Sequence, residues 1–428
     1  MDYTNELKRK TVSAEEAVLC LQDGDYVHTY GTSVEPVCFL ENLRLLKGRR
    51  KNITVVNFLG MTPFKYYTDE SYRGVINNES MFFSRFCGES QKIGMISYIP
   101  NHLRNSGSDR FDYMDQRSLP INAYVISAGP PDRHGCFSAA SVGMSNRALV
   151  ARADKVILEI NENLPRTFGD SFIHISEVDR VFWGDGKVRY LPEASADETD
   201  RAIGGYIAEI VEDESTIQLG IGSIPNAVAA ALKDKKDLGV HTEMLGDGIV
   251  RLCEAGVVTN RKKTHYPDRI VTSFSFGTKA VYDFLDDNPL VLHLDIAKVN
   301  SPFEIAKNRR MVSVNTTLRI DLMGQCASEA LGTLQISGTG GQTDTVTGAK
   351  MSPGGKSIIA LRSTAEVKEE GSVKRRISKI ASVHDAGTVI SLLRADVDFV
   401  VTEYGIASLR GASTKERARS LIGIAHPD

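Results

Sequence analysis

Residues 212–225 read EDESTIQLGIGSIP and residues 23–36 read DGDYVHTYGTSVEP, with a constant offset of 189 positions between the two stretches. Gly31 pairs with Gly220, and Pro36 pairs with Pro225. Each copy has an acidic turn, an apolar strand, a glycine loop and a proline that opens a helix, which is typical of a βα unit. The sequence therefore predicts two related halves.

A second, weaker match favours the same duplication. Residues 153–159 (ADKVILE) resemble residues 397–403 (VDFVVTE), and both stretches are typical of a buried strand that ends in a carboxylate. Along the chain, β-rich runs alternate with helical stretches, which predicts an α/β fold of two related open α/β domains with mainly parallel sheets and helical crossovers. Strands are expected at residues 53–56, 123–127, 270–274, 311–314 and 357–361, and helices at 14–21, 226–232 and 414–425.

The chain of 428 residues exceeds the size at which a single hydrophobic core usually stops growing. The best linker candidate is residues 184–200 (GDGKVRYLPEASADETD), which are rich in charge, glycine and small residues. We therefore expect an N-terminal domain at residues 1–194 and a C-terminal domain at residues 195–428. Because an amphipathic stretch and His426-Pro427 come directly before Asp428, a further helix is expected beyond that residue.

Composition excludes several classes of protein. Hydrophobic residues make up 42% and charged residues 25%, as in an ordinary globular enzyme. The net charge of −3 argues against a sequence-independent nucleic-acid binder, which needs a basic face. No run of 18 apolar residues occurs, so we expect no membrane span and a cytoplasmic location. The six cysteines form no CxxC pair, and the aspartates are dispersed, so no metal site is expected. No tightly bound cofactor is expected either.

The first candidate binding element is the glycine loop at residues 220–225 (GIGSIP). It follows a predicted strand and precedes a predicted helix, so its backbone N–H groups can face a phosphate, a carbonyl or an oxyanion. A dinucleotide-binding fingerprint is disfavoured because Pro225 replaces the third glycine of GxGxxG. A tight βα turn without a ligand is the structural alternative.

A second glycine loop spans residues 337–344 (SGTGGQTD). Gly338, Gly340 and Gly341 lie among small polar residues, where a backbone can approach a ligand closely. A simple β-turn is the alternative, although three glycines in four residues exceed what a turn requires. We favour a functional loop.

Three carboxylates are candidates for chemistry. Glu243, in the segment GVHTEM, is expected at the end of a strand, where open α/β sheets bind their ligands. Glu159 and Glu403 occupy similar strand ends, and spacing alone does not separate the three. His134 and His241 lie near glycine-containing segments, but neither has a Ser or Cys nucleophile elbow, so both are interpreted as structural hydrogen-bonding partners.

Four motifs, in this order, resemble the acetyl-CoA hydrolase/transferase family. They are GIGSIPNAV at residues 220–228, GVHTEM at 239–244, SGTGGQTD at 337–344 and VVTEYGIA at 400–407. The N-terminal half shares the resemblance through PPDRHGCF at 130–137. Within the family, GDSFIHISEVD at 169–179 together with HTEMLGDG at 241–248 is most similar to 4-hydroxybutyrate CoA-transferases, followed by butyryl-CoA:acetate CoA-transferases.

The resemblance implies a role for particular residues. The family's catalytic glutamate falls on Glu243, while Asn315 matches an asparagine that orients the reacting CoA group, and Glu403 matches a carboxylate close to the active site. The positions implied to bind CoA are Gln218, Leu219, Gly220, Ile221, Gly222, Leu318, Gly338, Gly340, Gly341 and Lys368.

The resemblance also implies a reaction. A CoA-transferase of this kind takes CoA from a short acyl-CoA, such as acetyl-CoA or butyryl-CoA, and passes it to a short carboxylic acid such as 4-hydroxybutyrate. The transfer is ping-pong through a glutamyl-CoA thioester, with CoA as a substrate and a homodimer or homotetramer as the usual assembly. Two alternatives stay open, an acyl-CoA thioester hydrolase on the same scaffold and a non-catalytic acyl-CoA sensor.

Overall fold

The computed structural model describes residues 3–140, 142–368 and 374–428. The chain forms two compact units. The first comprises Met1–Leu191, Thr272–Ala297 and Leu334–Gly338, and the second comprises Pro192–Val271, Lys298–Thr333 and Thr339–Asp428. The domain boundary that the sequence predicts, between residues 194 and 195, stays a proposal.

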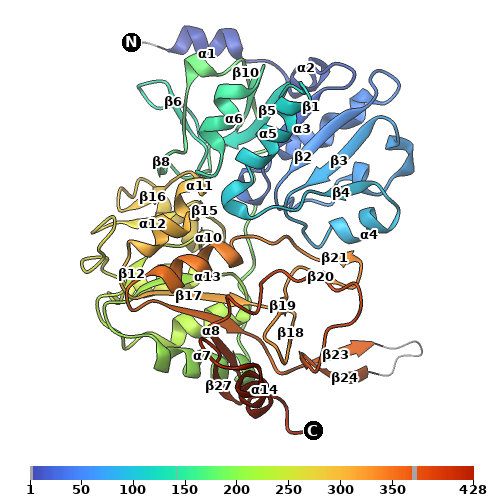
Figure 1. The fold of residues 1–428 in the computed structure, drawn as a ribbon. Helices are drawn as coiled ribbons and strands as arrows, with labels where there is room; N and C mark the ends of the chain where they lie inside the picture. Colours follow the sequence, from blue (N-terminus) through green and yellow to red (C-terminus); the bar gives the residue numbers. More distant parts are fainter. Residues whose placement is uncertain (1–2, 141, 369–373) are drawn as a thin grey trace. The chain divides into compact units, whose positions relative to one another are not determined.

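The first unit is built on a seven-stranded sheet whose strands are all parallel (Figure 1). Its order is β10 (Arg180–Trp183), β7 (Val156–Ile160), β5 (Ala123–Ala128), β1 (Tyr26–Thr29), β2 (Ile53–Asn57), β3 (Ile76–Ser80) and β4 (Ile96–Tyr98). Its helices include α1 (Thr4–Lys10), α2 (Ala14–Leu19), α3 (Val37–Asn42), α4 (Cys87–Lys92), α5 (Ser108–Gln116) and α6 (Asn146–Arg152). Strand residues such as Val27, Val55 and Val125 are fully buried, because helical crossovers cover both faces of a parallel sheet.

The second unit has a six-stranded sheet with one antiparallel edge strand, β27 (Figure 1). Its order is β12 (Gly239–Val240), β11 (Thr216–Leu219), β17 (Met311–Thr316), β22 (Lys356–Ala360), β26 (Phe399–Thr402) and β27 (Gly405–Ser408). The helices that accompany it include α7 (Glu198–Ile210), α8 (Ser223–Ala231), α9 (Asp247–Glu254), α12 (Pro302–Ala306), α13 (Gln342–Met351) and α14 (Thr414–Gly423). A hairpin of β23 (Thr364–Lys368) and β24 (Lys374–Ser378) follows β22.

The predicted duplication is confirmed by the position of the repeated strand in each sheet. β1 lies between β2 and β5, and β11 lies between β12 and β17. In each sheet, the strand of the repeat is therefore the one from which the later strands extend in both directions. In the second copy, α8 begins at Ser223, two residues before the expected opening at Pro225. The α/β class with mainly parallel sheets is also confirmed.

The weaker repeat match does not join equivalent strands. β7 lies two strands from β1, whereas β26 lies three strands from β11. In addition, Glu159 lies within β7, while Glu403 follows the end of β26. The match was wrong because any buried parallel strand near an acidic residue produces the same local pattern.

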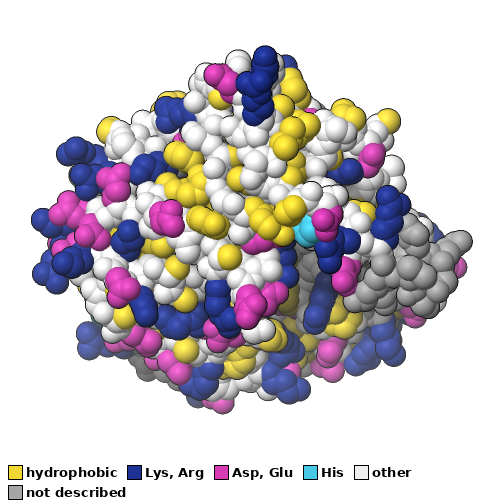
Figure 2. Space-filling model, turned by 90° about the horizontal axis from the view of Figure 1, so that it is seen from below, with side chains coloured by type: hydrophobic (Ala, Val, Ile, Leu, Met, Phe, Trp, Pro, Cys, Tyr) yellow, Lys and Arg dark blue, Asp and Glu magenta, His cyan; other side chains and the backbone are white. Residues whose placement is uncertain are grey.

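No helix among the described residues is both long and apolar enough to cross a membrane. On the face of the molecule seen in Figure 2, acidic and basic side chains are interspersed among the coloured atoms. Those described side chains form no extended surface of a single sign on that face.

Candidate active site

The carboxylate of Glu243 lies just beyond the end of an edge strand. β12 ends at Val240 and β13 (Met244–Leu245) begins one residue after Glu243, which sits in the bend between them. The parallel strands β12, β11, β17, β22 and β26 all end at the same edge of the sheet, where open α/β sheets bind ligands. Glu243 thus has the strand-end position that the sequence predicts.

A second side chain, Asn300, binds this carboxylate directly. Asn300 follows α11 (Ile296–Val299) and donates Nδ2–H to Glu243 Oε2 at 2.7 Å. The same Nδ2 lies 3.4 Å from Asp344 Oδ2 at the start of α13. Asn300 is fully buried, whereas Glu243 is partly buried.

The surroundings of Glu243 favour its neutral form. Burial raises the pKa of its carboxyl to about 7, and the nearby charge of Asp344 also raises it, while hydrogen bonds from Asn300 and from the Gly341 backbone lower the pKa. A carboxyl whose pKa is close to neutrality, at the ligand-binding edge of a sheet, is a candidate for a functional group.

The second glycine loop leads to this carboxylate. Gly341 caps the N-terminus of α13, and a Cβ on Gly341 would lie 1.8 Å from Glu243 Oε2 and 2.2 Å from Asn300 Nδ2. Gly340 has φ +60°, in the left-handed region that glycine adopts readily. Gly338 packs within the first unit, where a Cβ would lie 2.8 Å from the ring of Phe82. Gly341 therefore allows the loop to approach Glu243 closely, while the role of the loop in binding a ligand stays a prediction.

The first glycine loop borders a cavity of about 250 Å³ at the reversal point of the second sheet, between β11 and β17. Ile221 is 46% exposed, and Gly222, with φ +121°, begins the turn into α8. Pockets at such reversal points are the usual ligand sites of open α/β sheets. The cavity is lined by Ile221, Gly222, Ser223, Ile224, Pro225, Thr316, Thr317, Leu318, Ser328, Ala360, Leu361 and Lys379.

The structure brings several predicted CoA-binding residues together around this cavity. Ile221, Gly222 and Leu318 line it, and Gly220 precedes them at the end of β11. Gln218 and Leu219 lie within β11 and are buried, and Gln218 Oε1 has no hydrogen-bond partner among the described residues. Lys368 ends β23, and its side chain lies outside the described part of the chain.

Sequence reasoning missed Lys379 and Asn300. Lys379 lines the same cavity as Leu318, and burial and the nearby Arg362 lower its pKa. Asn300 is 57 residues from Glu243 in the chain. The only local signal for Asn300 is Ser301-Pro302, which opens α12 and places the asparagine in a loop.

The supporting residues predicted from the family resemblance have other contacts. Asn315, on β17, donates Nδ2–H to Thr345 Oγ1 at 3.0 Å. Glu403, just after β26, accepts hydrogen bonds from Ser363, from the backbone N–H at 2.9 Å and from the hydroxyl at 2.6 Å. Their proposed roles beside the reacting group therefore stay predictions.

Glu159 has the contacts of a structural carboxylate. It is buried within β7, where its Oε2 accepts the backbone N–H of Phe39 at 3.0 Å. Burial raises its pKa to about 7, so a raised pKa alone does not single out Glu243. What distinguishes Glu243 is the buried amide donor and the glycine loop that meet at its carboxyl oxygen.

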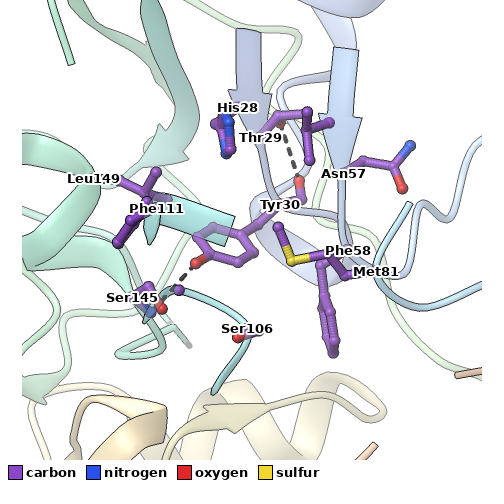
Figure 3. A pocket seen from close by; sticks show the side chains of 12 residues that line it. His28, Thr29, Tyr30, Asn57, Phe58, Met81, Ser106, Phe111, Ser145 and Leu149 are labelled. Carbon is purple, nitrogen blue, oxygen red and sulfur yellow. Dashed lines mark hydrogen bonds between the residues drawn. The ribbon is translucent and has the colours of Figure 1, made fainter. Parts of the chain in front are cut away.

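A smaller cavity, of about 20 Å³, lies in the first unit (Figure 3). Tyr30 lies between His28 and Phe58, and its hydroxyl accepts the backbone N–H of Ser145 at 3.3 Å. His28 is buried, its Nε2 has no partner among the described residues, and burial lowers its pKa to about 3. The cavity has room for about one water molecule.

Comparison with known proteins shows the family to which the chain belongs. The N-terminal domain of the acetyl-CoA hydrolase/transferase family matches residues 1–192, and its C-terminal domain matches residues 277–428. The 4-hydroxybutyrate coenzyme A transferase of Clostridium kluyveri is 38% identical and covers 100% of this chain and 97% of its own. The butyryl-CoA:acetate CoA-transferase of Anaerostipes caccae is 33% identical over 100% of this chain and 96% of its own.

A solved structure has the same fold over the whole chain. The crystal structure of RipA from Yersinia pestis superimposes with a TM-score of 0.88 at 33% sequence identity, covering 100% of this chain and 96% of RipA. The fold and the family resemblance are both confirmed by these matches.

Proposed function

The chain is a CoA-transferase of the acetyl-CoA hydrolase/transferase family, and we propose that it transfers CoA from a short acyl-CoA to a short carboxylic acid through a thioester on Glu243. The observation that carries this proposal is the meeting of Asn300 and Gly341 at the carboxyl of Glu243. A carboxylate held by fixed donors, yet partly exposed, is suited to nucleophilic attack.

The proposed first half-reaction forms two covalent species. The Glu243 carboxylate attacks the thioester carbonyl, the C–S bond breaks, and CoA leaves as a thiolate, so that a mixed anhydride of the acyl group and Glu243 remains. The thiolate then attacks the glutamyl carbonyl and expels the donor's carboxylate, which leaves a glutamyl-CoA thioester. The acceptor acid reverses these steps and leaves as its CoA thioester.

Fixed donors stabilise the charge that develops in these steps. The amide of Asn300 and the N–H of Gly341 are directed at the glutamyl oxygen, where negative charge develops during thiolate attack. The N–H groups of residues 220–222, at the N-terminus of α8, are proposed to donate hydrogen bonds to the acyl carbonyl oxygen. Because both sets are built into the fold, little reorganisation is needed during the reaction.

The cavity between β11 and β17 is proposed as part of the CoA site. It joins the first glycine loop to Leu318 and provides an apolar wall through Ile221 and Leu361. Binding energy from the non-reacting part of CoA would hold the thioester against Glu243, which compensates for the weak nucleophilicity of a carboxylate.

The raised pKa of Glu243 predicts a pH dependence of the first half-reaction. Only the deprotonated carboxyl attacks, and a pKa near 7 means that this form increases as the pH rises through 7. We expect kcat/KM for acyl-CoA to rise tenfold per pH unit below that value and to level off above it. A profile that is flat from pH 5 to pH 8 would contradict the perturbed carboxyl.

Lys379 is predicted to contribute to CoA affinity. Among the described residues that line the cavity it is the cation, and it is proposed to bind a phosphate of CoA. Replacing Lys379 with methionine is expected to raise KM for acyl-CoA by ~10-fold, the size of one charge-assisted hydrogen bond, with kcat changed less than ~2-fold. The matched control is Lys415→Met on the exposed face of α14, which should leave both constants unchanged. An unaltered KM in Lys379→Met would exclude this role.

One assay identifies the preferred acceptor acid and distinguishes CoA transfer from thioester hydrolysis. We propose 4-hydroxybutyrate as acceptor, in line with the relative from Clostridium kluyveri. Acetate, butyrate, 4-hydroxybutyrate and succinate are compared with one acyl-CoA donor, and free thiol is followed without any acceptor. Because Glu243 is partly exposed, water can reach its thioester, so rapid thiol release without acceptor would favour a thioester hydrolase.

Assembly and location are proposed on the same basis. We propose a homodimer or homotetramer in the cytoplasm, which sedimentation analysis of the purified chain and fractionation of its host would test.

A further inference from the structure

His241 lies two residues before Glu243, and both nitrogens of its ring are engaged. The side chain is buried, with Nε2 2.8 Å from the carbonyl oxygen of Val299 and Nδ1 3.2 Å from Nδ2 of Asn308. A carbonyl can only accept a hydrogen bond, so Nε2 carries the proton and donates it. Nδ1 then accepts a hydrogen bond from the Asn308 amide, so the contacts specify one neutral tautomer.

The electrostatic surroundings keep this ring neutral. Burial, together with the charge of Lys263 and the nearby His265, lowers the pKa of His241 to about 3, although the hydrogen bond to Val299 and the charge of Glu304 oppose this shift. The ring is therefore neutral throughout the working range of an enzyme. A histidine that stays neutral is not a general acid or base near neutral pH, so its value lies in the direction of its hydrogen bonds.

These hydrogen bonds link the two segments that meet at the reacting carboxyl. Val299 directly precedes Asn300, whose amide binds Glu243 at 2.7 Å. The ring of His241 therefore connects the segment that carries the nucleophile to the segment that carries its amide donor. Two hydrogen bonds, His241 to Val299 and Asn300 to Glu243, thus join residues 241–243 to residues 299–300.

Neighbouring buried groups anchor the segment that carries Glu243. Lys263 Nζ donates to the carbonyl of Val240 at 2.7 Å and to that of Arg269 at 2.8 Å. The backbone N–H of Thr242 donates to the carbonyl of Val271 at 2.9 Å. Residues on either side of His241 are thus anchored, which leaves the ring to set the position of Val299.

We propose that His241 is a positioning residue for CoA transfer, which holds Val299 through its Nε2–H so that Asn300 stays within hydrogen-bond distance of Glu243. Asn308 supports it by fixing the tautomer. This inference rests on the proposed function, because it assigns His241 to the transfer reaction at Glu243. It assigns a catalytic consequence to a histidine that the sequence indicated only as a structural partner.

Two substitutions of similar polarity test the direction of the bond. The amide nitrogen of glutamine can reach the position of Nε2, whereas that of asparagine reaches only the position of Nδ1. We expect His241→Asn to lower kcat by ~10²-fold, the effect of misplacing a reacting group by about 1 Å, with KM for acyl-CoA changed less than ~2-fold. His241→Gln, which can keep the bond to Val299, should retain kcat within ~5-fold of the wild type.

The pH profile separates a positioning role from a structural one. The hydrogen bond from Asn300 lowers the pKa of Glu243, so weakening that bond should move the midpoint of the kcat/KM profile to higher pH. We expect this shift in His241→Asn and not in His241→Gln. A merely structural role would lower the melting temperature without moving the midpoint.

The outcomes separate this inference from the proposed function. If the wild type forms no covalent CoA adduct with acyl-CoA, the proposed function fails. If the wild type forms the adduct and His241→Asn has wild-type kcat and an unchanged midpoint, the positioning role is overturned. Should His241→Asn not fold, Asn308→Leu removes the donor that fixes the tautomer, and we expect kcat to fall by ~10-fold with the midpoint raised. Wild-type behaviour of Asn308→Leu would then overturn the inference.

Discussion

Replacing Glu243 with glutamine is expected to lower kcat for CoA transfer by at least ~10⁴-fold, the scale seen when a covalent nucleophile is removed. A carboxamide has nearly the shape of the carboxyl and can still accept the hydrogen bond from Asn300. It cannot, however, form the anhydride and the thioester that the reaction needs. Steady-state transfer from acyl-CoA to 4-hydroxybutyrate measures the loss.

A matched control for this variant is Glu159→Gln. Glu159 is also a carboxyl whose pKa burial raises to about 7, but it binds the backbone of Phe39 within the first unit. The kcat of Glu159→Gln should stay within ~2-fold of that of the wild type. Transfer by Glu243→Gln above one hundredth of the wild-type rate, with mass spectrometry showing that the glutamine is intact, would exclude Glu243 as the nucleophile.

Replacing Gly341 with alanine is expected to lower kcat by ~10³-fold, the loss found when a fixed oxyanion donor is removed. The added Cβ would lie 1.8 Å from Glu243 Oε2, far inside contact distance, and 2.2 Å from Asn300 Nδ2. The carboxyl and the amide must therefore separate, and the N–H of Gly341 must move away from the glutamyl oxygen. Transfer kinetics and the melting temperature of the variant measure the effect.

Gly205→Ala is the control for this substitution. Gly205 lies in the middle of α7, and a Cβ there meets nothing within 4 Å. Alanine is the better helix former, so this variant should keep full activity and gain up to about 1 kcal/mol of stability. If Gly341→Ala were as active as Gly205→Ala, the close contact at Glu243 would have no part in the reaction.

The pattern of the sequence predicted much of the fold. The strand and glycine loop at residues 212–225 form β11 and the turn into α8, and β2, β5, β17 and β22 are found where β-rich runs predicted them. These elements were predictable because an apolar strand, a glycine and a helix opening are local signals. The place of each strand in its sheet is not local, which explains why residues 153–159 were matched to the wrong strand.

The candidate site was predictable in part. Local pattern placed Glu243 at a strand end but did not distinguish it from Glu159 or Glu403, and only the family resemblance did so. Asn300 reaches Glu243 from 57 residues away, and such a contact depends on how loops meet at the sheet edge. Lys379 was missed for the same reason, since it reaches the cavity from a segment beyond the β23–β24 hairpin.

The most direct measurement is the mass of the protein after incubation with acyl-CoA in the absence of an acceptor acid. We expect the mass of the peptide that contains Glu243 to increase by the mass of CoA less one water molecule, and this increase to be lost when 4-hydroxybutyrate is added. Turnover without any such adduct, or an adduct on a different residue, would contradict transfer through a thioester on Glu243.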